Sequence, residues 1–368
     1  MSFALHRQAM WRRGKVLVGV LLFIFIVTTK VNLDNRKRDS SSTPPRERSP
    51  TTTKVNLDNR KTDSSGTPPV DHSPTVTPTP GSPAKVKQRV AMVTSVNYRW
   101  NWEGAQEAFE LSAQERQAYA ALHGYSFDVI DVRSFKQDLV DPSWHVQWMK
   151  IPIVKHIFEK YPDADWVWWL DADAIIMGNQ DLDSYLFDRI ESLQAEARQF
   201  HSDNRREQYG MAMFKYLHNI TLAETNLIVT PDMDTPMINI GSFLIRRSET
   251  WTDMLLDLWA DPLFHKAAED RAIGFQEQGV LAHLIQQHKT IARHTAMVPM
   301  TSINAFAWAG PWTWRPDSLV MHEAGCYVHA LCRHWMREYR AVKKGEKDRV
   351  GLERAIRDTA WTAKEDKV

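Results

Sequence analysis

Two aspartates one residue apart, Asp171 and Asp173, directly follow the apolar run W-V-W-W-L at residues 166–170, and a second apolar run, 174–177, comes after them. Two carboxylates at the end of such a buried segment repel each other and raise each other's pKa. A divalent cation removes that cost, and hard oxygen ligands suit magnesium or manganese. We therefore expect a metal at this pair that can neutralise a leaving diphosphate. The alternative interpretation is a helix cap beside a surface acid.

Position distinguishes this pair from the other Asp-x-Asp pairs of the sequence. Residues 163 and 165 lie in the polar turn after Pro162, where solvated carboxylates are common. The pairs at 181/183 and 232/234 fall in loops or at helix starts, where capping explains them. Asp171 and Asp173 instead follow a buried strand, and ligands of open α/β sheets bind beyond the carboxyl ends of the strands.

The surrounding elements alternate between strands and helices. Expected strands cover residues 90–96, 127–132, 166–170, 226–230 and 242–246, and expected helices cover 103–123, 150–161, 250–259 and 275–288. This order predicts an α/β fold with a mostly parallel sheet flanked by helices.

Regions outside these elements suggest a membrane-anchored organisation. Residues 1–15 are basic and 16–29 are mostly apolar, which predicts a cytosolic tail and an uncleaved type II signal anchor with the rest of the chain in the lumen. A cleaved signal peptide is the alternative. Residues 30–87, rich in Ser, Thr and Pro, predict a disordered stem, in which the sequence of 28–45 returns almost unchanged at 52–69. A folded domain is expected at 88–340, followed by a charged helical tail at 341–368.

Composition excludes some classes of partner and leaves other questions open. A net charge of +1 gives no general attraction to nucleic acid. Cys326 and Cys332 lack the spacing of zinc or thioredoxin-like motifs, so a disulfide in an oxidising lumen and two buried free thiols both stay open. Asn219 begins an N-I-T sequon, which fits a luminal surface loop. Three tryptophans of a turn-rich stretch can stack on acceptor sugars or pack in the core: Trp308, Trp312 and Trp314.

Residues 148–177 resemble the signature of glycosyltransferase family 34. This family includes fungal Golgi α-galactosyltransferases, subunits of a yeast mannan α-mannosyltransferase complex and plant xyloglucan xylosyltransferases. Further motifs agree in order and spacing: N-I-G-S-F-L-I-R-R-S at 239–248, Q-E-Q-G-V-L-A-H-L-I-Q-Q-H at 276–288 and H-E-A-G-C at 322–326. The resemblance covers roughly residues 90–335. It implies a GT-A (Rossmann-like) fold in a single luminal catalytic domain, a nucleotide-sugar donor, a divalent metal that is usually manganese, and retention of anomeric configuration.

Several site residues follow from this resemblance. Asp171 and Asp173 would be the metal and donor-ribose carboxylates, and His322 would be the third metal ligand. Asn239 and Gly241 would line the donor sugar, the glycine because it allows close backbone approach.

Other donor-binding residues are expected from their positions. Lys150 stands at a helix start, where backbone N–H groups and a cation can both face phosphate, although a solvated lysine is equally consistent. Thr94 and Ser95 end the first strand and are expected to border the nucleotide.

Glu277 and Gln278 are the expected catalytic residues. In a retaining transfer, the Gln278 amide oxygen can stabilise positive charge on the sugar, and the Glu277 carboxylate can orient the sugar or add negative potential. Double displacement through a carboxylate nucleophile and front-face departure, in which the leaving diphosphate takes the acceptor's proton, both remain open.

The chain departs from the family pattern at two positions. Gly279 stands where many fungal members have aspartate, and Glu323 stands where phenylalanine is usual. The first is expected to remove a sugar contact or a secondary acid, and the second to place a charge beside His322.

The expected function is that of a Golgi type II glycosyltransferase that moves a hexose onto a glycan acceptor, with UDP-galactose favoured as donor and GDP-mannose second. The alternatives are a mannosyltransferase of a mannan-synthesising complex, a non-catalytic subunit of the same fold, and a metal-dependent phosphohydrolase. A homo- or hetero-oligomer in the Golgi is also consistent with the sequence. The acceptor and the linkage position are not readable from the sequence.

Overall fold

The computed structural model describes residues 86–97, 105–203, 213, 215–232, 237–307, 313–326, 332–348 and 351–352. All of them belong to one compact unit, Pro80–Val368. The expected cytosolic tail, signal anchor and stem, up to residue 85, lie outside the described residues, as does the chain beyond 352. Within the described part, no helix combines the length and the apolar composition needed to cross a bilayer.

The described residues form a six-stranded sheet in the order β2-β1-β3-β6-β5-β7. Strand β6 runs antiparallel to both of its neighbours, whereas the other pairs, β1 with β2, β1 with β3 and β5 with β7, are parallel. The predicted mostly parallel α/β sheet is therefore confirmed. The strands are Val90–Val96 (β1), Ser126–Asp131 (β2), Trp166–Leu170 (β3), Leu227–Pro231 (β5), Ile238–Arg246 (β6) and Thr295–Met297 (β7).

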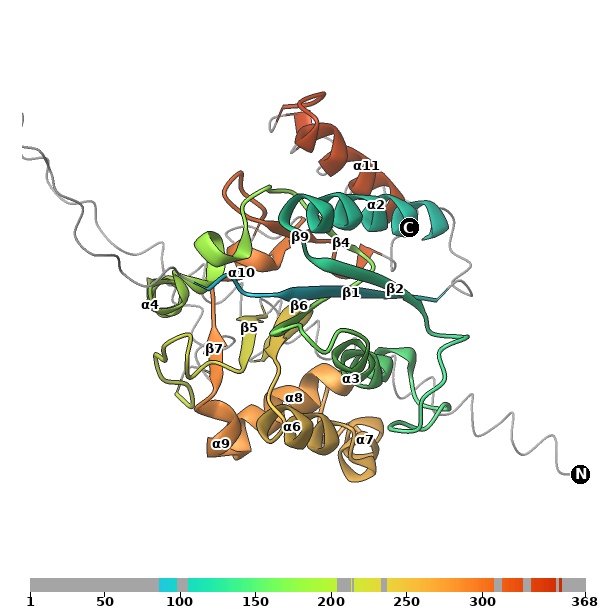
Figure 1. The fold of residues 1–368 in the computed structure, drawn as a ribbon, viewed down its shortest axis with the longest axis vertical. Helices are drawn as coiled ribbons and strands as arrows, with labels where there is room; N and C mark the ends of the chain where they lie inside the picture. Colours follow the sequence, from blue (N-terminus) through green and yellow to red (C-terminus); the bar gives the residue numbers. More distant parts are fainter. Residues whose placement is uncertain are drawn as a thin grey trace, which may run out of the picture. The chain divides into compact units, whose positions relative to one another are not determined.

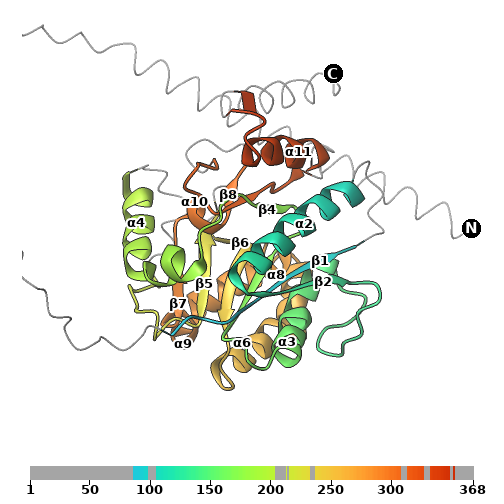
Figure 2. The same ribbon diagram turned by 45° about the horizontal axis from the view of Figure 1, so that its top comes forward.

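Strand β3 is apolar along its whole length because helices cover both faces of the sheet. Trp166 and Trp168 belong to one hydrophobic core with Tyr119 of α2 (Ala105–His123), whereas Val167 and Trp169 belong to another with Ile153 of α3 (Lys150–Lys160). Figures 1 and 2 show α2 on one side of the sheet and α3, α6 (Trp251–Trp259) and α8 (Gln276–Gln287) on the other. Alternating side chains of a strand point to opposite faces, so the tryptophans divide between the two cores.

A smaller sheet of the described chain, in the order β4-β9-β8, continues directly from β3. Strand β4 (Ala174–Ile176) pairs antiparallel with β9 (Val320–His322), which places Ala174 opposite His322, and β8 (Ala305–Phe306) completes this sheet. The segment that carries Asp171 and Asp173 is thus the connection between the two sheets.

The C-terminal helix α11 (Cys332–Lys343) packs against α2 and crosses position 340, where the domain was expected to end. Arg340 and Lys343 of α11 form ion pairs with Glu115 of α2. A disulfide joins Cys326 to Cys332 at the start of this helix, which settles the question left open by the sequence. The other described α-helices are Ile190–Asp203 (α4), Pro262–Glu269 (α7), Lys289–Ala292 (α9) and Met300–Ile303 (α10).

Candidate active site

Backbone hydrogen bonds hold the connection that follows β3 in place. The Asp171 N–H donates to the Gly241 carbonyl of β6 at 2.7 Å, and the Ala174 N–H donates back to the Asp171 carbonyl at 2.9 Å. The Asp173 carbonyl accepts a hydrogen bond from the Glu323 N–H at 2.9 Å. Backbone hydrogen bonds to β6, to β4 and to the residue after β9 therefore fix the main chain of both aspartates.

The side chains of Asp171, Asp173 and His322 converge, as the sequence analysis expected. Their potential ligand atoms all lie within 4.8 Å of one another, and the His322 Nε2 is 3.4 Å from an Asp173 carboxylate oxygen. Burial by itself would raise the pKa of Asp173 and lower that of His322, but their mutual attraction lowers the former and raises the latter. Two carboxylates and one imidazole form a donor set that fits manganese.

Gly241 makes room for His322. A Cβ atom at position 241 would lie 2.0 Å from the His322 Cε1 atom, closer than any side chain tolerates. The glycine was expected to allow close approach of the donor sugar. In the structure, the space beside its Cα is taken by the imidazole, so this residue positions a potential metal ligand.

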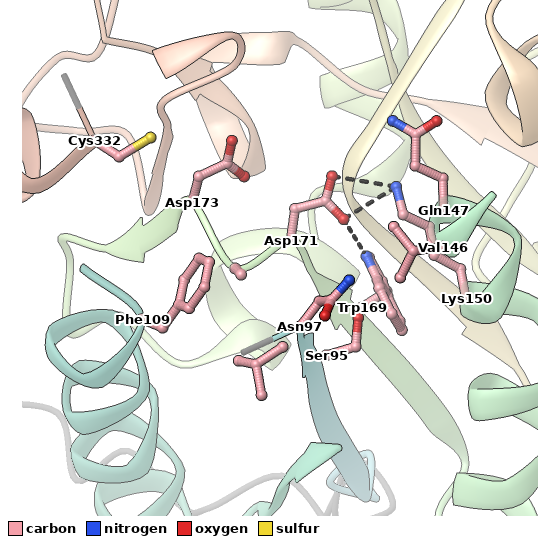
Figure 3. Close-up of a pocket in the computed structure, with 12 residues that line it drawn as sticks. Ser95, Asn97, Phe109, Val146, Gln147, Lys150, Trp169, Asp171, Asp173 and Cys332 are labelled. Carbon is pink, nitrogen blue, oxygen red and sulfur yellow. Dashed lines mark hydrogen bonds and ion pairs between the residues drawn. The ribbon is translucent and has the colours of Figure 1, made fainter. Parts of the chain in front are cut away.

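Lys150 binds both Asp171 and Glu277. Its Nζ lies 3.0 Å and 3.1 Å from the two Asp171 carboxylate oxygens and 3.1 Å from a Glu277 oxygen. The Trp169 indole N–H also donates to Asp171, at 2.7 Å. In Figure 3, Lys150 and Trp169 lie on one side of the Asp171 carboxylate, and Asp173 lies on its other side. Lys150 is therefore a buried member of an ionic network, not a solvated lysine.

The charges of this network depend on one another. Burial alone would lower the pKa of Lys150, but Asp171 and Glu277 raise it above its ordinary value. Burial raises the pKa of Glu277, and the attraction of Lys150 only partly offsets it. The Glu277 side chain is 3% exposed and is bound to Lys150, and its expected catalytic role stays a prediction.

Gln278 and Asn239 belong to a polar network at the carboxyl end of β5. The Gln278 side-chain oxygen accepts the Ile240 N–H at 3.2 Å, and its amide donates to Asp232 at 3.3 Å. The Asn239 oxygen accepts the Gly241 N–H at 3.0 Å, and its amide also donates to Asp232, at 3.2 Å. Both amides thus fix the backbone of β6, a role that was not expected from the sequence.

Asp232 lies in the loop after β5, as expected, but among the described residues its carboxylate does not cap a helix. It is 8% exposed and accepts hydrogen bonds from both Asn239 and Gln278. It follows β5, which runs in the same direction as β3, so the two strands end at the same edge of the sheet. Ligands of open α/β sheets bind beyond the carboxyl ends of the strands. This rule pointed to Asp171 after β3, and it points equally to Asp232 after β5.

Two neighbouring cavities lie at this edge of the sheet, and the Asp171 side chain lines the first of them. The first, of about 110 Å³, is lined by Ser95, Asn97, Lys150, Asp171 and Asp173 among others. The second, of about 470 Å³, shares Asn97 and Val146 with it and lies beyond the ends of β1 and β2. Thr94 lines neither cavity: it is 1% exposed, and no described residue hydrogen-bonds to its hydroxyl.

The backbone around position 279 explains why a glycine stands there. Phe275 and Gln276 have positive φ angles of 65° and 50°, which turn the Gly274 carbonyl back over the first turn of α8. A Cβ atom on residue 279 would lie 1.6 Å from that carbonyl oxygen. The aspartate of other family members therefore does not fit this local backbone.

Replacement of Gly279 by aspartate is expected to lower the free energy of unfolding by about 3 kcal/mol, because the Gly274 backbone must move. Thermal unfolding of the purified chain measures this loss. Gly274→Ala is the control, since a Cβ atom there meets nothing within 4 Å. Equal melting temperatures for Gly279→Asp and wild type would contradict this explanation.

Glu323 is completely buried, and no described residue hydrogen-bonds to either of its carboxyl oxygens. Burial, with a smaller contribution from Asp173, raises its pKa well above the ordinary value. The carboxyl group therefore favours its neutral form, which weakens the charge that was expected beside His322.

The remaining candidates divide between core and surface. Trp314 is 7% exposed and packs edge-on against Tyr339, so it is a core residue. Trp308 and Trp312 lie outside the described residues. Asn219 of the sequon is exposed, which leaves glycosylation there a prediction.

A mostly parallel sheet with helices on both faces, and a carboxylate pair beyond the end of β3, are the features of the GT-A fold class. The model of the galactosyl transferase GMA12/MNN10 family matches residues 86–333. The chain therefore belongs to this family, glycosyltransferase family 34, as its motifs indicated.

Some relatives of the chain are named galactosyltransferases, and another is named a mannosyltransferase. An uncharacterized alpha-1,2-galactosyltransferase of Schizosaccharomyces pombe is 36% identical over 61% of this chain and 58% of its own length. The "Probable alpha-1,6-mannosyltransferase MNN10" of Saccharomyces cerevisiae is 30% identical over 65% of this chain and 61% of its own length. The chain thus spans about three fifths of the length of these relatives. Among solved structures, a glycosyltransferase involved in glycosylation of the major capsid of PBCV-1 has 14% identity and a TM-score of 0.44, covering 68% of this chain and 98% of its own.

Proposed function

We propose that the chain is a metal-dependent, retaining hexosyltransferase that transfers α-galactose from UDP-galactose to a glycan acceptor. The observation that carries this proposal is the convergence of Asp171, Asp173 and His322 beside a cavity at the end of β3. Transfer of mannose from GDP-mannose is the second candidate, because a relative named for that sugar matches a similar share of the chain.

The residues present fit a divalent cation, with manganese favoured. Asp171, Asp173 and His322 would hold it, and when bound it supplies positive charge that stabilises a leaving diphosphate. Lys150 adds a second positive charge at the cavity wall, held in place by Asp171 and Glu277. The larger adjoining cavity, with Phe135, Trp144 and Arg133 in its lining, offers apolar and cationic surface for the nucleoside.

The environment of the carboxylates favours the front-face route. Double displacement requires a carboxylate with a free face toward the sugar. Glu277 is buried and bound to Lys150, and Asp232 is engaged by Asn239 and Gln278. With these groups occupied, the leaving diphosphate is the base that we propose for the acceptor's proton.

We also propose that the chain works as a type II protein of the Golgi membrane, anchored by residues 16–29 with its catalytic domain in the lumen. Support comes from the basic residues 1–15 and the mostly apolar residues 16–29 that precede the stem.

A donor panel tests the proposed activity. The purified chain is incubated with Mn²⁺ and one donor at a time: UDP-galactose, UDP-glucose, UDP-xylose or GDP-mannose. The release of UDP or GDP is measured. We expect kcat/KM for UDP-galactose to exceed that for each other donor by at least about 10-fold, the discrimination that a few polar contacts supply. A preference for GDP-mannose would replace galactose by mannose. Absence of turnover with every donor would favour the non-catalytic subunit.

A further inference from the structure

Arg116 of α2 is a buried cation that the proposed mechanism does not use. It is 0% exposed, although it lies in a helix whose other face is solvated. A buried guanidinium is costly unless its N–H groups and its charge are both matched. Burial lowers its pKa to about 9, against the opposing effect of Asp171 and Asp173. Arg116 therefore remains a cation at neutral pH, beneath the two carboxylates.

The guanidinium of Arg116 binds the backbone on both sides of the Asp171–Asp173 connection. Its Nη1 donates to the Leu170 carbonyl at 3.4 Å, and its Nη2 donates to the carbonyls of Asp171 and Ala174, the latter at 2.7 Å. Ser112, one helical turn earlier, adds a hydroxyl hydrogen bond to the same Ala174 carbonyl at 2.7 Å. Residues four apart lie on one face of a helix, so α2 clamps this connection along a single edge.

The hydrogen bonds of Arg116 and Ser112 hold the backbone that positions all three potential metal ligands, Asp171, Asp173 and His322. Asp171 is held through its own carbonyl, and Asp173 lies between the bound carbonyls of Asp171 and Ala174. Ala174 is the partner of His322 in the pairing of β4 with β9, so a shift of Ala174 changes the position of His322 as well. A lysine has the charge of arginine but not its planar set of donors, and cannot satisfy this group of carbonyls together.

We propose that Arg116 is a positioning residue for the metal site: it fixes the backbone from Leu170 to Ala174 so that the Asp171, Asp173 and His322 side chains face one point. The metal part of this inference rests on the proposed function, whereas the clamp itself does not. Groups that orient metal ligands from behind are typically worth about 10- to 100-fold in metal affinity.

The test compares the full-length chain with its Arg116→Lys and Arg247→Lys variants. Arg247 is a matched control, because its guanidinium also donates to backbone carbonyls, those of Phe158, Tyr161 and Ala164, at 2.7 to 2.9 Å. Those residues precede β3, so they lie at the opposite end of that strand from Asp171. Three properties are measured: the melting temperature, hydrogen–deuterium exchange of residues 170–174 without metal, and Mn²⁺ affinity from the paramagnetic resonance signal of free Mn²⁺.

Both variants are expected to melt at lower temperature, since each loses hydrogen bonds that are buried or partly buried. Only Arg116→Lys is expected to weaken Mn²⁺ binding, by about 10- to 100-fold, and to speed amide exchange over 170–174. A purely structural role would lower the melting temperature and leave the affinity of the folded protein unchanged. Wild-type affinity and exchange in Arg116→Lys, or equal weakening by Arg247→Lys, would overturn the proposal.

Two further results remain decisive. If the wild type binds no Mn²⁺, the proposed metal-dependent function fails, and the exchange measurement alone supports or overturns the clamp.

If Arg116→Lys does not fold, Ser112→Ala replaces it. That variant removes one hydrogen bond to Ala174 and is expected to weaken Mn²⁺ binding roughly 3-fold, and an unchanged affinity together with unchanged exchange would count against the clamp.

Discussion

Replacement of Asp173 by asparagine is expected to lower kcat/KM for sugar transfer on the order of 10³-fold. The change keeps the size of the side chain but removes one anionic ligand and the charge that faces His322 at 3.4 Å. Loss of metal-based charge stabilisation costs several kcal/mol in the transition state, and each 1.4 kcal/mol is a factor of ten. Initial rates with UDP-galactose and Mn²⁺, together with the Mn²⁺ affinity, measure the effect.

Asp163→Asn is the matched control for this change. Asp163 belongs to another Asp-x-Asp pair, and its side chain is 91% exposed beside Arg89. Its removal is expected to leave transfer within about 2-fold of wild type, because exposed ion pairs contribute little. Removal of metal from the wild type by a chelator should reproduce the loss seen in Asp173→Asn. Equal rates for wild type and Asp173→Asn would end the enzymatic interpretation.

The second large effect is expected from a single added methyl group. Gly241→Ala places a Cβ atom 2.0 Å from the His322 ring, whereas ordinary contacts begin at 3.4 Å. The imidazole must therefore move by more than about 1 Å, and a displacement of that size in an active site costs about 10²-fold in rate. We expect kcat/KM to fall about 10²-fold and Mn²⁺ affinity to fall with it.

Gly178→Ala is the matched control for Gly241→Ala. A Cβ atom at position 178 also lies 2.0 Å from its nearest neighbour, but that neighbour is the end of the flexible Gln180 side chain. The side chain can turn away, so the variant should transfer sugar at a near wild-type rate. If Gly241→Ala kept full activity while folded, His322 would not be a ligand that needs its present position.

Much of the fold was predictable because the information is local. An uninterrupted apolar run such as β3 indicates a strand covered on both faces, and its burial is observed on both sides. The aspartates that follow it were placed at the sheet edge by the same argument. His322 was identified from a family motif, since nothing in its immediate sequence marks it as a partner of residues so far away in the chain.

Tertiary structure decided how the side chains of the site are used. Glu277 and Lys150 come from different helices, and only the packing of these helices shows that the acid is buried against the lysine. Asp232 was misread because its link to Gln278 joins segments far apart in sequence. Gly279 is required by a carbonyl that two residues with positive φ turn toward it.

The sequence by itself determined the first five strands of the main sheet, the helices α2, α3, α6 and α8, and the acidic pair at the end of β3, because these depend on the hydrophobic pattern of neighbouring residues. The short strands β4, β7, β8 and β9 were not predicted. The structure alone decided that β4 pairs with β9, that a disulfide closes the 326–332 segment, and that Arg116 lies beneath the aspartates. Those features depend on which distant segments come into contact, and the free energy of such contacts is set by the packed chain as a whole.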